Sequence, residues 1–124
     1  MLRSGEDIDE LQAALLRTIA SVQRLRIIHR LGVAECEVGE LAAHLGLSQA
    51  ATSQHLGALR AVGLVEAGRE GRVMRYRLSD PEILAACSLM RSVLVRRLTR
   101  LGDLAAAADR QESALATAAP GGQR

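Results

Sequence analysis

Residues 41–65 read LAAHLGLSQAATSQHLGALRAVGLV and contain the clearest structural signals of the chain. Gly46 and Leu47 follow a short apolar run and turn the chain. Ser48 is a favoured N-cap for the helix that follows, and Gly63 stands just past its end, where a left-handed C-cap belongs. These cues predict two short helices, over residues 39–45 and 48–62, joined by a tight turn. They form a helix-turn-helix.

A change of period follows this unit directly. Residues 73–78 alternate apolar side chains with Val73 and two arginines, and a second short run covers residues 64–67. A period of two predicts strands, so the two runs and the turn-rich residues 68–72 form a β-hairpin. Arg69 and Arg72 flank its tip. If the protein binds double-stranded DNA, these two side chains can reach the minor groove of the DNA or the phosphates beside it. Two further arginines on the polar face of the strand, Arg75 and Arg77, serve either phosphate contacts or solubility.

Three other helices complete the expected fold. The first covers residues 6–20 and starts at a capping-box-like Ser4 and Asp7. The second is capped by Ser21, runs to Leu31 and stops at Gly32. We expect its buried side to carry Val22, Leu25, Ile28 and Leu31. The last helix opens at Asp80-Pro81 with the stripe Ile83, Cys87, Met90, Leu94, Leu98, Leu101 and Ala105. It also carries apolar residues off that stripe, which favours burial against a partner subunit.

The predicted architecture is mainly α with a small β-hairpin: a winged helix-turn-helix in the order α-α-α-α-β-β-α. We expect one domain over residues 1–110 and a disordered tail over residues 111–124, which is rich in Ala, Gly and Ser. Four arginines of the last helix, at positions 91, 96, 97 and 100, form either a solvated face or a pairing surface for the acidic residues 6–10.

The composition excludes several classes of protein. All 16 basic residues are arginine, and Tyr76 is the single aromatic residue. Without lysine there is no Schiff-base enzyme and no phosphate-loop lysine. Without aromatic platforms, single-stranded RNA is not an expected partner. No apolar run approaches the roughly 18 residues of a membrane span, so we expect no membrane partner.

The same reading predicts a cytoplasmic protein that is not an enzyme. The acidic N-terminus does not resemble a signal peptide, and two cysteines do not make a disulfide framework. No Ser or Cys has a His base placed beside it by local spacing, and no carboxylate pair forms a recognisable site. The net charge of +2 means that any role with nucleic acid rests on where the arginines lie.

The second helix of the helix-turn-helix has two different sides. At about 100° per residue, Ala51, Thr52, Leu56, Leu59 and Val62 share one side, and Ala50, Ser53, Gln54 and Gly57 share the other. Small residues let a helix enter the major groove of double-stranded DNA. Gln54 can pair with adenine there, and Ser53 can contact a base or a phosphate. Gln49 lies at the helix N-terminus, where backbone N–H groups favour phosphate.

From about residue 23 to residue 90 the chain resembles the ArsR/SmtB family of small winged-helix repressors. The residues that carry the resemblance are RLRII at 24–28, VGELA at 38–42, LSQAATSQHL at 47–56, LR at 59–60, GLV at 63–65 and GRVMRYRL at 71–78. The resemblance implies a homodimer formed by the first and last helices, which binds a palindromic operator and is released by an inducer. It also implies that Ser48, Gln49, Ser53, Gln54 and His55 line the DNA, although His55 can equally be a packing residue.

The sensing sites of that family are not intact in this chain. One metal site would place two cysteines where Glu37 and Gly39 stand, and Cys36 is one position too early. A second site has Asp80 and Glu82 at its first pair, but Val93 and Arg96 at its second. A pair of thiols that responds to reactive sulfur would occupy the positions of His29 and Val95. No cofactor is therefore identified.

Cys36 and Cys87 leave two interpretations open. They can form a dithiol sensor of a thiol-reactive effector or hold a soft metal ion with a histidine. Alternatively, Cys87 is a small buried apolar residue and Cys36 an incidental thiol. The sequence predicts a homodimeric repressor of double-stranded DNA. The rivals are a winged-helix module for protein–protein assembly without specific DNA binding, and a DNA-binding protein without an effector.

Overall fold

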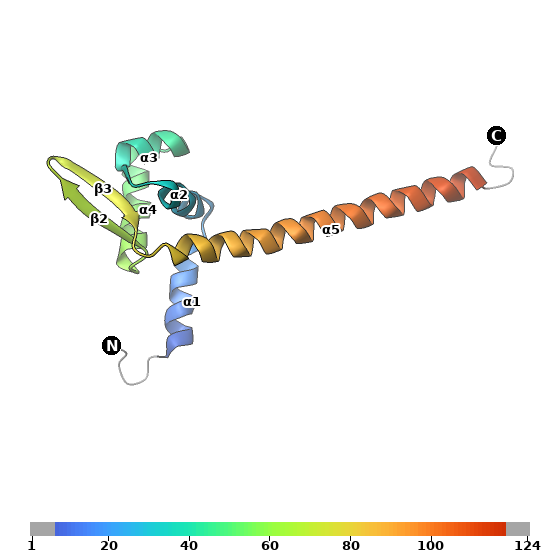
Figure 1. Cartoon of the computed structure of the whole chain (residues 1–124), viewed down its shortest axis with the longest axis horizontal. Coiled ribbons are helices and arrows are strands. Elements are labelled where there is room, and N and C mark those ends of the chain that lie inside the picture. Colours follow the sequence, from blue (N-terminus) through green and yellow to red (C-terminus); the bar gives the residue numbers. More distant parts are fainter. Residues whose placement is uncertain (1–6, 119–124) are drawn as a thin grey trace. The chain divides into compact units, whose positions relative to one another are not determined.

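The computed structural model describes residues 7–118 and contains five helices and three strands in that range. In chain order they are α1 (Ile8–Ile19), α2 (Val22–Val33), β1 (Cys36–Glu37), α3 (Val38–Leu45), α4 (Gln49–Ala61), β2 (Val65–Glu70), β3 (Val73–Leu78) and α5 (Glu82–Ala118) (Figure 1). The chain divides into two compact units, Met1–Cys87 and Ser88–Arg124. The first contains α1 to β3 and the beginning of α5 as far as Cys87, and the second contains the rest of that helix.

Side chains cap three of the helices, and two of these caps, Ser21 and Ser48, are the predicted residues. The Asp7 carboxylate accepts from the Glu10 N–H at 3.0 Å, and the Ser48 hydroxyl accepts from the Ala51 N–H at 3.0 Å. The Ser21 hydroxyl accepts from the N–H of Arg24 at 3.3 Å. Each bond satisfies a backbone donor that has no partner within its own helix. Ser4, the expected cap of α1, lies outside the described residues. The cap is instead Asp7, so α1 covers Ile8–Ile19 and not the expected residues 6–20.

An aliphatic core lies between α2, α3, α4 and the sheet. Its buried members are Ile27, Ile28, Leu31, Cys36, Leu41, Leu56, Leu59, Leu64 and Val65. The expected buried side of α2 was half wrong, because Val22 is 62% exposed and Leu25 37% exposed, whereas Ile27 is fully buried. Both sides of α2 carry apolar residues, so periodicity could not tell which side α3, α4 and β3 would cover.

Helix α2 also passes through the glycine that was expected to end it. Gly32 lies within α2, and a Cβ at this position would collide with the Leu84 side chain. The glycine therefore provides room for the first turn of α5 beside α2.

The sheet has one strand more than the sequence predicted. Its antiparallel order is β1-β3-β2, and Cys36 of β1 pairs with Tyr76 of β3. The hairpin is also longer than expected, because Gly68 and Arg69 pair with β3 instead of forming part of the turn. A two-residue strand is too short to show a period, and a glycine in a strand reads as a turn residue.

Helix α5 differs from expectation at both ends. It begins at Glu82, whose N–H donates to the Asp80 carboxylate at 2.8 Å, and not at Pro81. It continues through Gly102 to Ala118, so residues 111–118 are helical and were wrongly assigned to a tail. Ala, Gln, Glu and Arg are good helix formers, and no proline interrupts the sequence from Glu82 to position 119. Residues 119–124 lie outside the described residues, and the single domain over 1–110 stays a prediction.

Two glycines set the turns on which the site depends. Gly46 has φ of 69°, and its N–H donates to the carbonyls of α3, closing that helix as predicted. Gly71, with φ of 64°, is the first residue of the two-residue hairpin turn, where a positive φ matches the twist of the strands. Gly63 also has the expected left-handed backbone, with φ of 79°.

We predict that Gly46→Ala lowers the free energy of unfolding by about 1–2 kcal/mol, because a Cβ is strained at this backbone conformation. Urea unfolding followed by circular dichroism, at a fixed protein concentration, measures the change. The matched control is Gly57→Ala, since Gly57 is exposed inside α4 and a Cβ there meets no heavy atom within 4 Å. This control should raise stability by about 1 kcal/mol. An unchanged stability of Gly46→Ala would contradict the account of the turn.

Candidate nucleic-acid interface

The turn between α3 and α4 is held by backbone hydrogen bonds. The Leu47 N–H donates to the Ala42 carbonyl at 3.0 Å, which ties the start of the turn to a buried residue of α3. Ser48 then begins α4, and its carbonyl accepts from the hydroxyl of Thr52 at 2.9 Å. Thr52 is fully buried, so this bond satisfies the one polar side chain among the buried residues described.

Helix α4 separates its residues as the sequence predicted. Thr52, Leu56 and Leu59 are buried, while Ala51 and Val62 at the border are half-buried. The exposed residues are Ser48 at the cap and, within α4, Gln49, Ala50, Ser53, Gln54, Gly57, Arg60 and Ala61. The outward surface of α4, which we call the α4 face, is therefore made of small or uncharged side chains around Ser53 and Gln54, and its exposed charge is Arg60 in the last turn of the helix.

The first residue of α4 lies close to α3. A Cβ added at Gly39 would stand 3.3 Å from Nε2 of Gln49, which places the Gln49 amide beside the first turn of α3. Gln49 is also the first residue of α4 and is exposed. It therefore combines a side-chain amide with the unpaired backbone N–H groups of a helix N-terminus.

His55 is held from a neighbouring helix. It is half-buried, and its Nδ1 accepts from Nε of Arg24 at 3.2 Å. The structure thus gives His55 the packing contact that the sequence left as one of two interpretations. Arg24 is the residue that sequence reasoning missed at this site, because 31 positions separate the two and no local pattern links them.

The hairpin divides its arginines into two pairs. Arg75 Nε lies 3.5 Å from Glu70 Oε1, and Arg77 Nη2 lies 3.2 Å from Glu66 Oε1. Within residues 7–118 these are the ion pairs of the hairpin, and neither Arg69 nor Arg72 takes part in one. Both are exposed, and Arg72 lies in the turn itself. The uncompensated positive charge is therefore concentrated at the tip.

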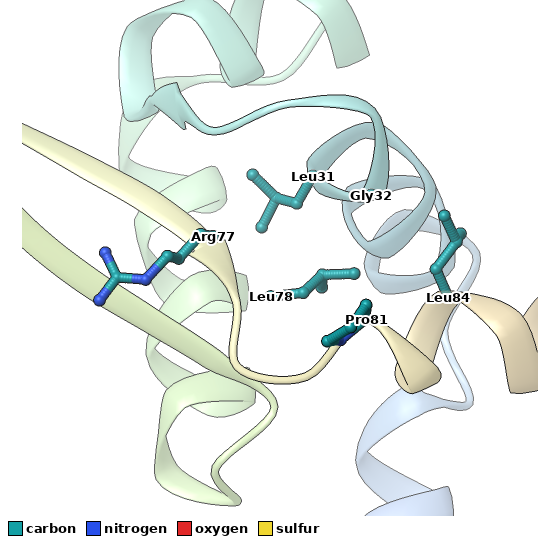
Figure 2. Close-up of a pocket in the computed structure, with 6 residues that line it drawn as sticks. All are labelled: Leu31, Gly32, Arg77, Leu78, Pro81 and Leu84. Atoms are coloured by element: carbon teal, nitrogen blue, oxygen red, sulfur yellow. The ribbon is translucent and has the colours of Figure 1, made fainter.

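A small pocket opens at the base of the hairpin. It has a volume of about 200 Å³ and is lined by Leu31, Gly32, Arg77, Leu78, Pro81 and Leu84 (Figure 2). Figure 2 shows the Arg77 guanidinium pointing away from the leucines, which agrees with its pairing to Glu66. The pocket is smaller than the roughly 300–1,000 Å³ of typical small-molecule sites. It is not the candidate site.

The two cysteines lie in or against the core. Cys36 is fully buried, and Cys87 is half-buried against the same cluster. Both thiols are free, and burial raises the pKa of each above its ordinary value of 9.0. A raised pKa lowers the fraction of thiolate, which is the reactive form and the metal ligand. Among the described residues, no group of three or more His, Cys, Asp or Glu side chains could hold a metal ion.

Comparison with known proteins assigns the family. Residues 21–67 match the sequence pattern of the bacterial regulatory proteins of the arsR family. The HTH-type transcriptional regulator Rv0081 of Mycobacterium tuberculosis is 37% identical over 96 residues, which cover 77% of this chain and 84% of that protein. The HTH-type transcriptional regulator CmtR of the same organism is 46% identical over 74 residues, which cover 60% of this chain and 63% of CmtR.

Solved structures agree with the sequence relatives. The crystal structure of Rv0081 superposes with a TM-score of 0.70 at 36% identity, over 77% of this chain and 97% of that one. The solution structure of Mb0332 from Mycobacterium bovis, a homodimeric winged helix-turn-helix DNA-binding domain, gives a TM-score of 0.70 at 27% identity, over 79% of this chain and 95% of that one. In the part of the chain described here, no helix is both long and apolar enough to cross a membrane.

The predicted winged helix-turn-helix is thus confirmed. The prediction that the protein is a regulator and not an enzyme is confirmed by these relatives as well. With the α4 face beside a hairpin whose tip is basic, and with these relatives, the chain belongs to the ArsR family of bacterial regulatory proteins and is a DNA-binding transcriptional regulator.

Proposed function

We propose that the protein is a repressor that binds a palindromic operator as a homodimer, with α4 in the major groove. The observation that carries the proposal is the α4 face, which presents small residues around Ser53 and Gln54. A surface without bulky side chains lets a helix approach the base edges closely. A regulator bound in this way represses by covering the DNA that the transcription machinery needs.

The exposed residues of α4 are proposed to make different kinds of contact with the DNA. Gln54 is the residue for sequence preference, because a glutamine amide pairs bidentately with adenine. Ser53 contacts a base edge or a phosphate, and Ala50 gives the room for close approach. Ser48 and Gln49 lie where backbone N–H groups at the start of α4 favour a phosphate.

The hairpin tip supplies the sequence-independent part of binding. Arg69 and Arg72 carry charge that no described acidic residue compensates, so they are free to neutralise phosphates or enter the adjacent minor groove. Arg75 and Arg77 already pair with glutamates of the same hairpin and contribute less. Action on chromosomal DNA places the protein in the cytoplasm of a bacterium.

The dimer is proposed to form through α1 and α5, because both helices expose large apolar side chains. These are Ile8, Leu11 and Leu16 on α1 and Leu89, Met90, Val93, Leu94, Val95, Leu98, Leu101, Leu104 and Leu115 on α5. A continuous apolar stripe on a helix predicts burial against another surface, and two copies of one regulator suit the two halves of a palindromic site.

The charges of α5 favour an antiparallel arrangement of the two copies. Before Gly102, residues 91–100 carry four arginines and no acidic residue. After it, Asp103, Asp109 and Glu112 outnumber Arg110. Two α5 helices running in opposite directions place the basic segment of each beside the acidic segment of the other, which gives electrostatic complementarity.

An effector that releases the DNA is also proposed, on the resemblance to the family alone. Cys36 and Cys87 are the candidate sensing groups for a thiol-reactive effector or a soft metal ion. Their burial and raised pKa values favour the alternative, in which both are structural. Their reactivity in the folded protein distinguishes the two interpretations.

We predict that Arg72→Ala weakens DNA binding uniformly across sequences and reduces the slope of log K against log salt by about 1 per subunit. The loss of a phosphate contact removes released counterions and no base readout. Fluorescence anisotropy with a duplex from upstream of the protein's own gene, and with an unrelated duplex of equal length, measures both effects.

The matched control is Arg75→Ala in the same hairpin, which removes an arginine already paired with Glu70 and should have a smaller effect. Gln54→Ala should instead lose about 1–3 kcal/mol of preference for the upstream duplex while keeping the salt dependence. Absence of salt-dependent binding to either duplex at low salt would favour a protein–protein assembly module.

We predict that the protein sediments at twice the mass of one chain and that Leu98→Glu raises the dimer dissociation constant by about tenfold or more. Burial of an unpaired carboxylate in an apolar contact is unfavourable. Thr99→Glu adds the same charge one residue on, about 100° away from the stripe, and should leave the dimer intact. Equal dissociation by both variants, measured by analytical ultracentrifugation, would show that the stripe is not the contact.

We predict that both thiols react more slowly with a disulfide reagent in the folded protein than in urea, and Cys36 more slowly than Cys87. Raised pKa values leave less thiolate at pH 7.5, and Cys36 is the more deeply buried of the two. Cys36→Ser and Cys87→Ser each isolate one thiol for the rate measurement. A thiol that reacts as fast in the folded protein as in urea would instead support a sensor.

A further inference from the structure

The side chain of Arg24 joins three helices of the first unit. Its Nε donates to His55 Nδ1 on α4 at 3.2 Å, and its Nη1 donates to the Thr18 carbonyl in the last turn of α1 at 3.0 Å. Arg24 itself lies in the first turn of α2, where its backbone N–H is bonded to the Ser21 cap. The guanidinium is therefore held on both sides and has a defined position relative to α4.

The bond to Arg24 determines where His55 carries its proton. A guanidinium has five N–H donors and no acceptor, so the ring nitrogen that faces it must be the bare one. The neutral imidazole then carries its proton on Nε2. Within residues 7–118, the buried side-chain atom that lacks a partner is Gln23 Oε1. Among these residues no hydrogen bond is formed with Nε2 of His55, and this atom is not one of the buried atoms without a partner. Nε2 therefore reaches solvent.

His55 occupies the border of the α4 face. It follows Gln54 by one residue, which is about 100° around the helix, and lies between the buried and the exposed sides. A side chain at this border meets the wall of a groove and not its floor. The wall of the major groove is phosphate, for which a fixed N–H is a suitable donor.

We propose that Arg24 is a positioning residue for DNA binding. It holds His55 as the Nε2–H tautomer, with that N–H directed outward to a DNA phosphate at the edge of the groove. The inference rests on the proposed DNA-binding role of α4. It adds a residue of α2, outside the reading helix, that acts through His55 and makes no contact with DNA itself.

The tautomer is tested directly on the unmodified protein. Long-range proton–nitrogen NMR spectra distinguish a protonated ring nitrogen from a bare one, and comparison with His55→Gln assigns the His55 signals among the three histidines. We expect a bare Nδ1 and a protonated Nε2 near neutral pH. A protonated Nδ1 on neutral His55 would overturn the proposal whatever the DNA affinity is.

Two substitutions of His55 separate the two ends of its ring. In His55→Asn the amide reaches about as far as Nδ1 and can still accept from Arg24, but the outward donor is lost. In His55→Gln the amide reaches about as far as Nε2 and restores an outward donor. We expect His55→Asn to weaken DNA binding about tenfold or more and His55→Gln to recover part of this loss. Equal affinities of His55→Asn and wild type would overturn the phosphate contact.

A double-mutant cycle tests whether Arg24 acts through His55. Arg24→Met should weaken binding severalfold when His55 is present and have little further effect in His55→Asn, whereas independent roles would give additive losses and overturn the proposal. Arg26→Met is the matched control, because Arg26 is exposed on the same helix.

Thermal melts check that each variant folds. If Arg24→Met does not fold, the NMR measurement of the His55 tautomer and the DNA affinities of the His55 variants still test the proposal. A wild-type protein that fails to bind either duplex would refute the proposed function, whereas wild-type binding with an additive cycle refutes this inference alone.

Discussion

The burial of Thr52, Leu56 and Leu59 fixes the rotation of α4 about its own axis, and the rest of the DNA-binding surface depends on it. A helix that buries one side against α2, α3 and the sheet must turn the other side outward. Rotation of α4 by one residue would place Ser53 in the core and a leucine in solvent, and the loss of apolar burial opposes this. The hydroxyl of Thr52 adds to the constraint, because it remains satisfied by the Ser48 carbonyl where α4 begins.

The placement of charge is a second constraint on the DNA-binding surface. The chain has 16 arginines and a net charge of only +2, so attraction to DNA depends on local separation of charge. Glu66 and Glu70 neutralise two arginines within the hairpin, which leaves the positive charge at the turn. Arg75 and Arg77 are paired with glutamates, whereas among the described residues Arg69 and Arg72 are not. The uncompensated positive charge of the hairpin therefore lies at its turn and not along the polar face of its strands. On α4 the exposed charge is Arg60 in the last turn, and the surface around Ser53 and Gln54 carries none, so the proposed roles in affinity and in sequence preference fall mainly on different elements.

Several features of the site were predictable because their causes are local. The left-handed backbone at Gly46, the cap at Ser48 and the alternation of residues 73–78 each depend on a few neighbouring positions. The two sides of α4 also followed from a single helical period. Prediction failed where apolar residues covered more than one side of a helix, as at Ile27 and Leu25, and where an element was too short to show a period, as in β1. The end of α5 was missed because a composition rich in alanine was taken for a tail, although alanine is the strongest helix former.

Local patterns in the chain therefore account for the order of the elements apart from β1, for the turn of the helix-turn-helix and for the residues exposed on the α4 face. Tertiary structure alone decided which side of α2 is buried, that Gly32 makes room for Leu84, and that Arg24 meets His55. The physical reason is the range of the interactions. Caps, turns and periods are set within one or two turns of the chain, whereas a contact between residues 31 positions apart exists only after the core has brought their helices together.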